Sequence, residues 1–92
     1  MDDIITIKLV TGAEIIGRLK EKTAVSIKVE KPVELMVSDR GLGFAPVCIS
    51  IDDASEFSFL QDHILFSAPT RKELVDQYIK ATTGIQLATS LK

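Results

Sequence analysis

A histidine beside an aspartate is the pair of residues in this chain best suited to recognition chemistry. His63 is the only histidine, and it follows Gln61 and Asp62 in a short polar stretch. An imidazole next to a carboxylate can donate and accept hydrogen bonds at the edge of a nucleobase, and its charge changes near neutral pH. The alternative is a solvated histidine in a turn, and the residues leave both interpretations open.

A second polar group, Lys22, Thr23 and Ser26, lies in another short connection. The lysine could meet a phosphate and the hydroxyls could bond a base, although hydroxyls in such connections more often bond the local backbone. Asp52 and Asp53 could bind a cation weakly, but the neighbouring sequence supplies too few further ligands for a dedicated metal site. We therefore predict no bound metal.

The residue combinations that catalysis requires are missing. The chain has one cysteine and one histidine, with no nucleophile elbow, no metal-ligand spacing and no glycine-rich phosphate loop. We therefore expect a protein that is not an enzyme and uses no cofactor. Cys48 has no partner for an intrachain disulfide, and we interpret it as a small side chain in a strand over 44–51.

Strands with period-two alternation must position these polar groups. The first strand has an apolar face of Ile5, Ile7 and Leu9. The second has Ile15, Gly17 and Leu19 on one face and Ile16, Arg18 and Lys20 on the other. Thr11 and Gly12 predict a tight turn between them. Gly17 lies inside the alternation, so it predicts a bend, a bulge or a close approach of another backbone.

The remaining sequence predicts more strands and one helix. A third strand should have Val25, Ile27 and Val29 facing inward and should continue to residue 37, with Lys31-Pro32 as a bulge or edge position. Strands over 44–51, 56–60 and 64–66 follow, and the last is apolar on both faces, as expected of a strand covered by a neighbour. Thr70 and Glu73 have capping-box spacing, and the helix they open has the apolar stripe Leu74, Val75, Tyr78 and Ile79, with Gly84 as its C-cap.

The first two strands resemble a known motif. In order and spacing, the first motif of the Sm-like proteins is matched by Ile5, Ile7, Leu9, Gly12, Gly17 and Leu19. The resemblance implies a mainly β fold: a small, five-stranded, strongly bent Sm-like (SH3-like) barrel over residues 1–69. A C-terminal helix over 70–84 would pack on the barrel or at an interface, and 85–92 would be a flexible tail. The family also implies a closed homo-oligomeric ring of six or seven subunits, in which the final strand pairs edge to edge with the fourth strand of the next subunit.

In such rings two connections line the pore and bind single-stranded RNA. The resemblance places six residues of this chain in these pore connections: Lys22, Thr23, Ser26, Gln61, Asp62 and His63. Bacterial RNA chaperones of the family hold a Lys-His pair where this chain has Asp62-His63. The family's usual Asp and Asn are absent from residues 22–26, and its Arg-Gly pair is absent from 64–69. The alternative function is therefore a non-catalytic oligomeric scaffold or protein-interaction module of the same fold that binds no RNA.

Composition limits the possible partners. The net charge is −2 and the sequence pI is about 5.3, which argues against a protein held to nucleic acid chiefly by phosphate contacts. We expect the cations Lys8, Arg18, Lys20 and Lys28 to form a solvated face. The chain lacks a signal peptide and an apolar run long enough to cross a bilayer, so we expect a cytoplasmic protein without membrane contact. With 92 residues it makes one domain that would benefit from oligomerisation.

Overall fold

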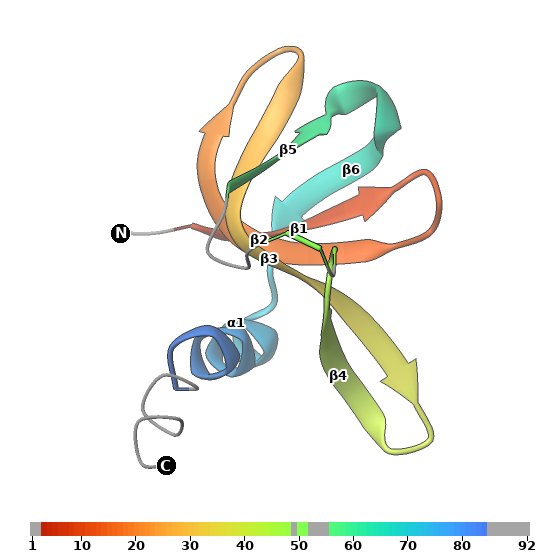
Figure 1. The fold of residues 1–92 in the computed structure, drawn as a ribbon, viewed down its shortest axis with the longest axis vertical. Helices are drawn as coiled ribbons and strands as arrows, with labels where there is room; N and C mark the ends of the chain where they lie inside the picture. Colours follow the sequence, from red (N-terminus) through yellow and green to blue (C-terminus); the bar gives the residue numbers. More distant parts are fainter. Residues whose placement is uncertain (1–2, 49, 52–55, 85–92) are drawn as a thin grey trace.

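A computed structural model of the protein describes residues 3–48, 50–51 and 56–84. In chain order its elements are β1 (Ile4–Leu9), β2 (Glu14–Lys22), β3 (Ser26–Ser38), β4 (Gly41–Pro46), β5 (Glu56–Leu60), η1 (Gln61–His63), β6 (Ile64–Pro69), α1 (Lys72–Ile79) and η2 (Lys80–Gly84). The strands form one antiparallel sheet, and η1 and η2 are a 3-10 and a π-helical turn (Figure 1). The fold is therefore mainly β with a C-terminal helix, as expected.

The expected closed barrel of five strands is wrong in two respects. The sheet has six strands in the order β4-β3-β2-β1-β6, and β5 pairs with the N-terminal part of β3. The strand predicted over 44–51 begins earlier, at Gly41, and ends at Pro46, whereas the strand predicted over 56–60 is β5. Within the described residues β5 pairs only with β3 and β6 only with β1, which leaves the bent sheet unclosed.

The first core lies on the concave side of the bent sheet. Its fully buried members are Ile7, Ile15, Ile27 and Val29. Half-buried residues of β1, β5 and β6 pack around them, including Leu9, Phe57 and Phe59. The expected inward faces of the first three strands are thus confirmed, except at Val25, whose side chain is 68% exposed because it lies in the turn before β3.

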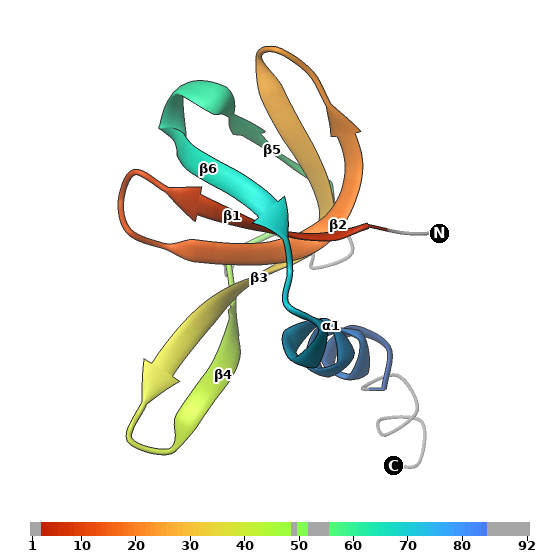
Figure 2. The ribbon, with the colours of Figure 1, turned by 180° about the vertical axis from the view of Figure 1, so that it is seen from behind.

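A second core lies between α1 and the other face of the sheet. Tyr78 of α1 is fully buried against Ile4 and Ile16, with Leu74 and Val75 packed beside it. Since Ile15 belongs to the first core and Ile16 to the second, β2 is apolar on both faces. Figure 2 shows α1 below β1 and β2, at the end of the molecule away from η1.

The predicted capping box does not form. The helix begins at Lys72, its N-cap is Arg71, and no side-chain hydrogen bond caps it. Thr70 instead continues the pairing of β6 with β1, because its N–H donates to the carbonyl of Ile4 at 3.1 Å. Its hydroxyl oxygen lies 2.8 Å from that of Thr6. Thr70 therefore fixes the sheet edge, and the helix starts two residues later.

Gly17 lies opposite a bulge in β3. Ile16 pairs with Val33 and Arg18 with Glu30, so Gly17 alone faces both Lys31 and Pro32. A Cβ at Gly17 would lie 3.0 Å from Cβ of Val29 and 3.5 Å from Cα of Pro32. The predicted close approach at Gly17 and the predicted bulge at Lys31-Pro32 are two sides of one contact.

Tyr78 holds this bulge from the helix side. Its hydroxyl donates to the carbonyl oxygens of Lys31 at 2.7 Å and Glu30 at 3.1 Å. Lys31 has a positive φ of 51°, in the left-handed region that non-glycine residues seldom adopt. The hydrogen bonds from Tyr78 thus stabilise an unfavourable backbone conformation and attach α1 to the sheet.

The Gly17→Ala variant should lower the free energy of unfolding by about 1–3 kcal/mol, because Cβ of Val29 is fixed to the backbone and has little room to move. Gly43→Ala is the matched control, since a Cβ there meets nothing within 4 Å and its φ is not positive. We expect this control to be neutral or stabilising by up to about 1 kcal/mol. Urea denaturation followed by circular dichroism measures both, and equal stabilities would contradict the close approach.

Tyr78 should titrate abnormally. Its burial raises the pKa of the phenol from 10.0 to about 12. An unfolded chain loses this proton at lower pH than the folded one, so stability is intact below pH 10 and falls as the pH rises through 12. The chain has one tyrosine and no tryptophan, so tyrosinate absorbance reports this residue alone.

We expect a native absorbance midpoint near pH 12 and a midpoint near 10 in denaturant. The Tyr78→Phe variant should lose about 1–2 kcal/mol at neutral pH because two carbonyls lose their donor. Its stability should also fall less steeply than that of the wild type at alkaline pH. A native midpoint near 10 would contradict the buried hydroxyl.

Candidate nucleic-acid interface

The turn between β2 and β3 is held by its own threonine. Oγ1 of Thr23 accepts hydrogen bonds from the N–H groups of Val25 at 3.2 Å and Ser26 at 3.1 Å. The N–H of Thr23 donates in turn to the carbonyl of Ser26 at 2.9 Å. The hydroxyl of Thr23 therefore bonds the local backbone, which was one of the two uses expected from the sequence, and it stabilises the turn.

Gln61 joins this turn to η1. Its side-chain Nε2 donates to the carbonyl of Thr23 at 3.0 Å, and its N–H donates to that of Val25 at 2.8 Å. The pairing of β3 with β5, which places Ser26 opposite Leu60, brings the two connections together. The two polar groups singled out in the sequence thus lie side by side at one end of the sheet.

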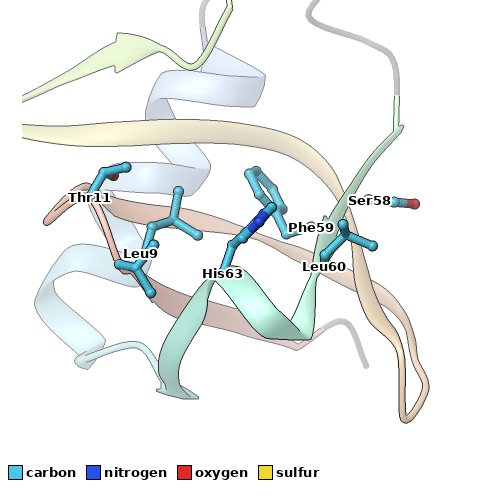
Figure 3. A pocket seen from close by; sticks show the side chains of 7 residues that line it. Leu9, Thr11, Ser58, Phe59, Leu60 and His63 are labelled. Carbon is cyan, nitrogen blue, oxygen red and sulfur yellow. The ribbon is translucent and has the colours of Figure 1, made fainter.

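His63 lies on the other side of η1, beside a hollow. Its carbonyl accepts a hydrogen bond from the N–H of Val10 at 2.9 Å, which fixes η1 to the end of β1. The hollow has a volume of about 530 Å³ and is lined by Leu9, Val10, Thr11, Ser58, Phe59, Leu60 and His63. In Figure 3 the imidazole lies beside the Phe59 ring, with Leu9 next to both. An exposed hydrogen-bonding ring thus borders an open and mainly apolar surface.

Lys22 and Asp62 complete the set of predicted site residues. Lys22 ends β2 opposite Ile27, and its side chain is exposed and has no ion pair with the described residues. Asp62 is also exposed, and within the same part of the chain it makes no hydrogen bond to His63. Asp62 and His63 are therefore two separate exposed polar groups among the described residues.

Sequence reasoning missed most of the hollow. Phe59 is half-buried against the first core and also lines the hollow. The alternation in β5 could have placed Phe57 and Phe59 on one face. Nothing local predicts that Leu9 and Thr11 lie near them, because that depends on the contact of η1 with β1.

Four cations lie on the convex face of the sheet, which is the face turned away from the first core. They form ion pairs, as expected of a solvated face. Their ion pairs are Lys8 with Glu14 at 3.9 Å, Arg18 with Glu30 at 3.9 Å, Lys20 with Glu30 at 4.0 Å and Lys28 with Glu21 at 3.8 Å. Each such partly exposed pair contributes little stability. Their consequence is electrostatic, because these cations are partly neutralised as ligands for phosphate.

Among the described residues, no group of three or more His, Cys, Asp or Glu side chains is arranged to hold a metal ion. Asp52 and Asp53 lie outside the described residues, as does the tail predicted over 85–92. Cys48 follows the end of β4, so its predicted place in a strand is wrong. Its thiol lies 3.7 Å from the hydroxyl of Ser50, and this hydrogen bond lowers the pKa of Cys48.

None of the helices in the described residues is long and apolar enough to span a membrane. No protein-family model matches the chain, and no curated protein matches it in sequence.

Proposed function

We propose that this chain assembles into a homo-oligomeric ring, six or seven copies as the Sm-like resemblance implies, and binds single-stranded RNA near the pore. The observation that carries the proposal is the unclosed sheet. Within the described residues, β5 and β6 each leave one edge without a partner strand. Unpaired backbone groups on an edge strand are a template for another strand.

Exposed apolar side chains accompany these two edges. Leu60 of β5 is 49% exposed, and Leu65 and Phe66 of β6 are 61% and 58% exposed. β6 carries no charged residue of the kind that protects a free edge from pairing. β6 of one copy, laid beside β5 of the next, would continue the sheet and cover these side chains. Such a head-to-tail interface gives a ring when the rotation between neighbouring copies closes after a whole number of copies.

In this proposal the RNA site lies where η1 contacts the turn between β2 and β3. His63 and Phe59 offer a ring edge and an apolar face to a base, and Lys22 offers a charge to a phosphate. Thr23 and Gln61 are already hydrogen bonded, so they position the site and take little part in contact. Ser26 and Asp62 border it and add acceptors. A ring would repeat this arrangement around its pore.

A scaffold without RNA is the second candidate function. It is favoured by the internal hydrogen bonds of Thr23 and Gln61, by the paired cations of the convex face and by the net charge of −2. In this case the ring would present its surfaces to proteins. A ring that binds neither U-rich nor A-rich RNA would support the scaffold.

Phe66→Lys should disrupt the ring, because it places a charge where a neighbouring strand would pack. Val37→Lys is the matched control, since Val37 is 77% exposed and lies near the end of β3 beside β4, away from both edges. Light scattering at micromolar concentration should give at least six copies for the wild type and for the control. A wild type that runs as a monomer, or rings that persist in Phe66→Lys, would count against the proposed edges.

RNA binding is tested by fluorescence anisotropy with labelled U-rich and A-rich oligomers at moderate salt. His63→Ala should weaken binding about tenfold, as expected when a side chain that stacks on a base or bonds its edge is removed. Lys22→Ala should reduce the slope of log K against log salt by about 0.7 for each phosphate that the lysine neutralises in the wild type.

Lys80→Ala removes the same charge from η2, beyond α1, and should change neither quantity. Binding by none of the proteins, with rings intact, would exclude the RNA function. Equal effects of Lys22→Ala and Lys80→Ala would show that binding depends on overall charge and would contradict the site.

A further inference from the structure

The hairpin of β3 and β4 projects from the rest of the sheet. In Figures 1 and 2 it extends away from η1, to the end of the molecule where α1 lies. Its strands pair from Val33 with Pro46 to Ser38 with Gly41. The base of the hairpin belongs to the second core through Leu35 and Phe44. Its tip is a separate surface, away from the edges of β5 and β6.

This tip is apolar and exposed. Val37 is 77% exposed, its cross-strand partner Leu42 is 54% exposed, and Met36 is 46% exposed. By strand alternation Val37 and Leu42 share a face with Leu35 and Phe44. An apolar stripe thus runs from the second core onto an uncovered arm, which indicates a contact surface.

The outer edge of β4 is also unprotected. Among the described strands β4 pairs only with β3. Its residues from Gly41 to Ala45 carry no charge, and its single proline, Pro46, lies at the end of the strand. Edge strands that remain unpaired usually carry charges, bulges or internal prolines. This edge is therefore suited to pairing with a further β-strand.

The order of side-chain sizes in β4 suits a second copy of β4 as that strand. From 41 to 45 the sequence is Gly-Leu-Gly-Phe-Ala, alternately small and large about Gly43. In an antiparallel pair of two copies with Gly43 on the two-fold axis, Leu42 lies opposite Phe44 of the second copy. Gly41 then lies opposite Ala45 on the other face. Large residues meet on the apolar face and small residues meet on the opposite one.

We propose that β4 pairs antiparallel with β4 of a second copy of this chain, about a two-fold axis through Gly43. The pairing joins two hairpins into a four-stranded sheet, satisfies the outer backbone groups of β4 and covers Leu42. It uses neither β5 nor β6, so it is independent of the proposed ring. If both interfaces form, two rings stack face to face with dihedral symmetry.

Cross-linking tests the register of this pair. In a background of Cys48→Ser, Gly43→Cys would bring two Cα atoms to about 4.5–5.5 Å across the axis, within the range of a disulfide. Val37→Cys is the control on the same hairpin, because it is more exposed yet its two copies would be separated by three strand spacings, about 14 Å or more. Under mild oxidation Gly43→Cys should form covalent dimers rapidly and Val37→Cys slowly. Equal rates, or no dimer from Gly43→Cys, would overturn the pairing.

Native mass spectrometry separates this inference from the ring. The wild type should contain twice the number of copies in one ring, and Leu42→Lys should halve that number. Phe66→Lys should leave a dimer, and the double variant a monomer. If the wild type is a single ring and Leu42→Lys does not change it, the β4 pair is refuted and the ring is retained. If the wild type is a dimer and Leu42→Lys converts it to a monomer, the ring is refuted and the β4 pair is retained.

Discussion

The close approach of Gly17 to Val29 is the contact on which the rest of the structure depends. Because β2 has no side chain at this position, β3 can pass within van der Waals distance and form the bulge at Lys31-Pro32. Bulges bend a strand and increase its twist. Beyond the bulge β3 pairs with β4, and before it with β5. One long strand thereby serves two partners and two cores.

The helix and the bulge stabilise each other. Tyr78 fills the second core and donates to the carbonyls of Glu30 and Lys31, so the left-handed Lys31 and the docking of α1 depend on the same side chain. No side-chain hydrogen bond caps the N-terminus of this short helix. Its stability must come chiefly from packing, as is usual for helices of this length.

The pairing of β3 with two strands in succession also explains why several edges of the sheet have no partner strand. β4 and β5 occupy one side of β3 in succession, and β6 pairs only with β1, so three strands end the sheet within the described residues. A small chain with half its strands at an edge has few ways to cover apolar surface by itself. The exposed apolar residues of β4, β5 and β6 follow from this topology, and the proposed assemblies would cover them.

Alternation alone predicted the hairpin of β1 and β2, the opposite directions of Ile15 and Ile16, and the close approach at Gly17, because these depend on backbone sterics and a local period. The apolar stripe of α1 was also predictable from its spacing at Leu74, Val75 and Tyr78, whereas Ile79 is 39% exposed. The capping box failed, since Thr70 forms a better hydrogen bond with the sheet than with the helix. At Thr70, contact with Thr6, which lies 64 residues away in the sequence, takes the place of the local capping box.

The sequence by itself determined the first three strands, the turn at Gly12 and the polar residues that could recognise a ligand. Only the tertiary structure decided that the sheet remains open, that Gln61 binds the turn of Thr23, and that His63 lies beside Phe59 and Leu9. These arrangements come from pairing between distant strands, whose register depends on the bulge opposite Gly17. Local patterns specify which face of a strand is buried, whereas contacts across the chain specify which strands meet.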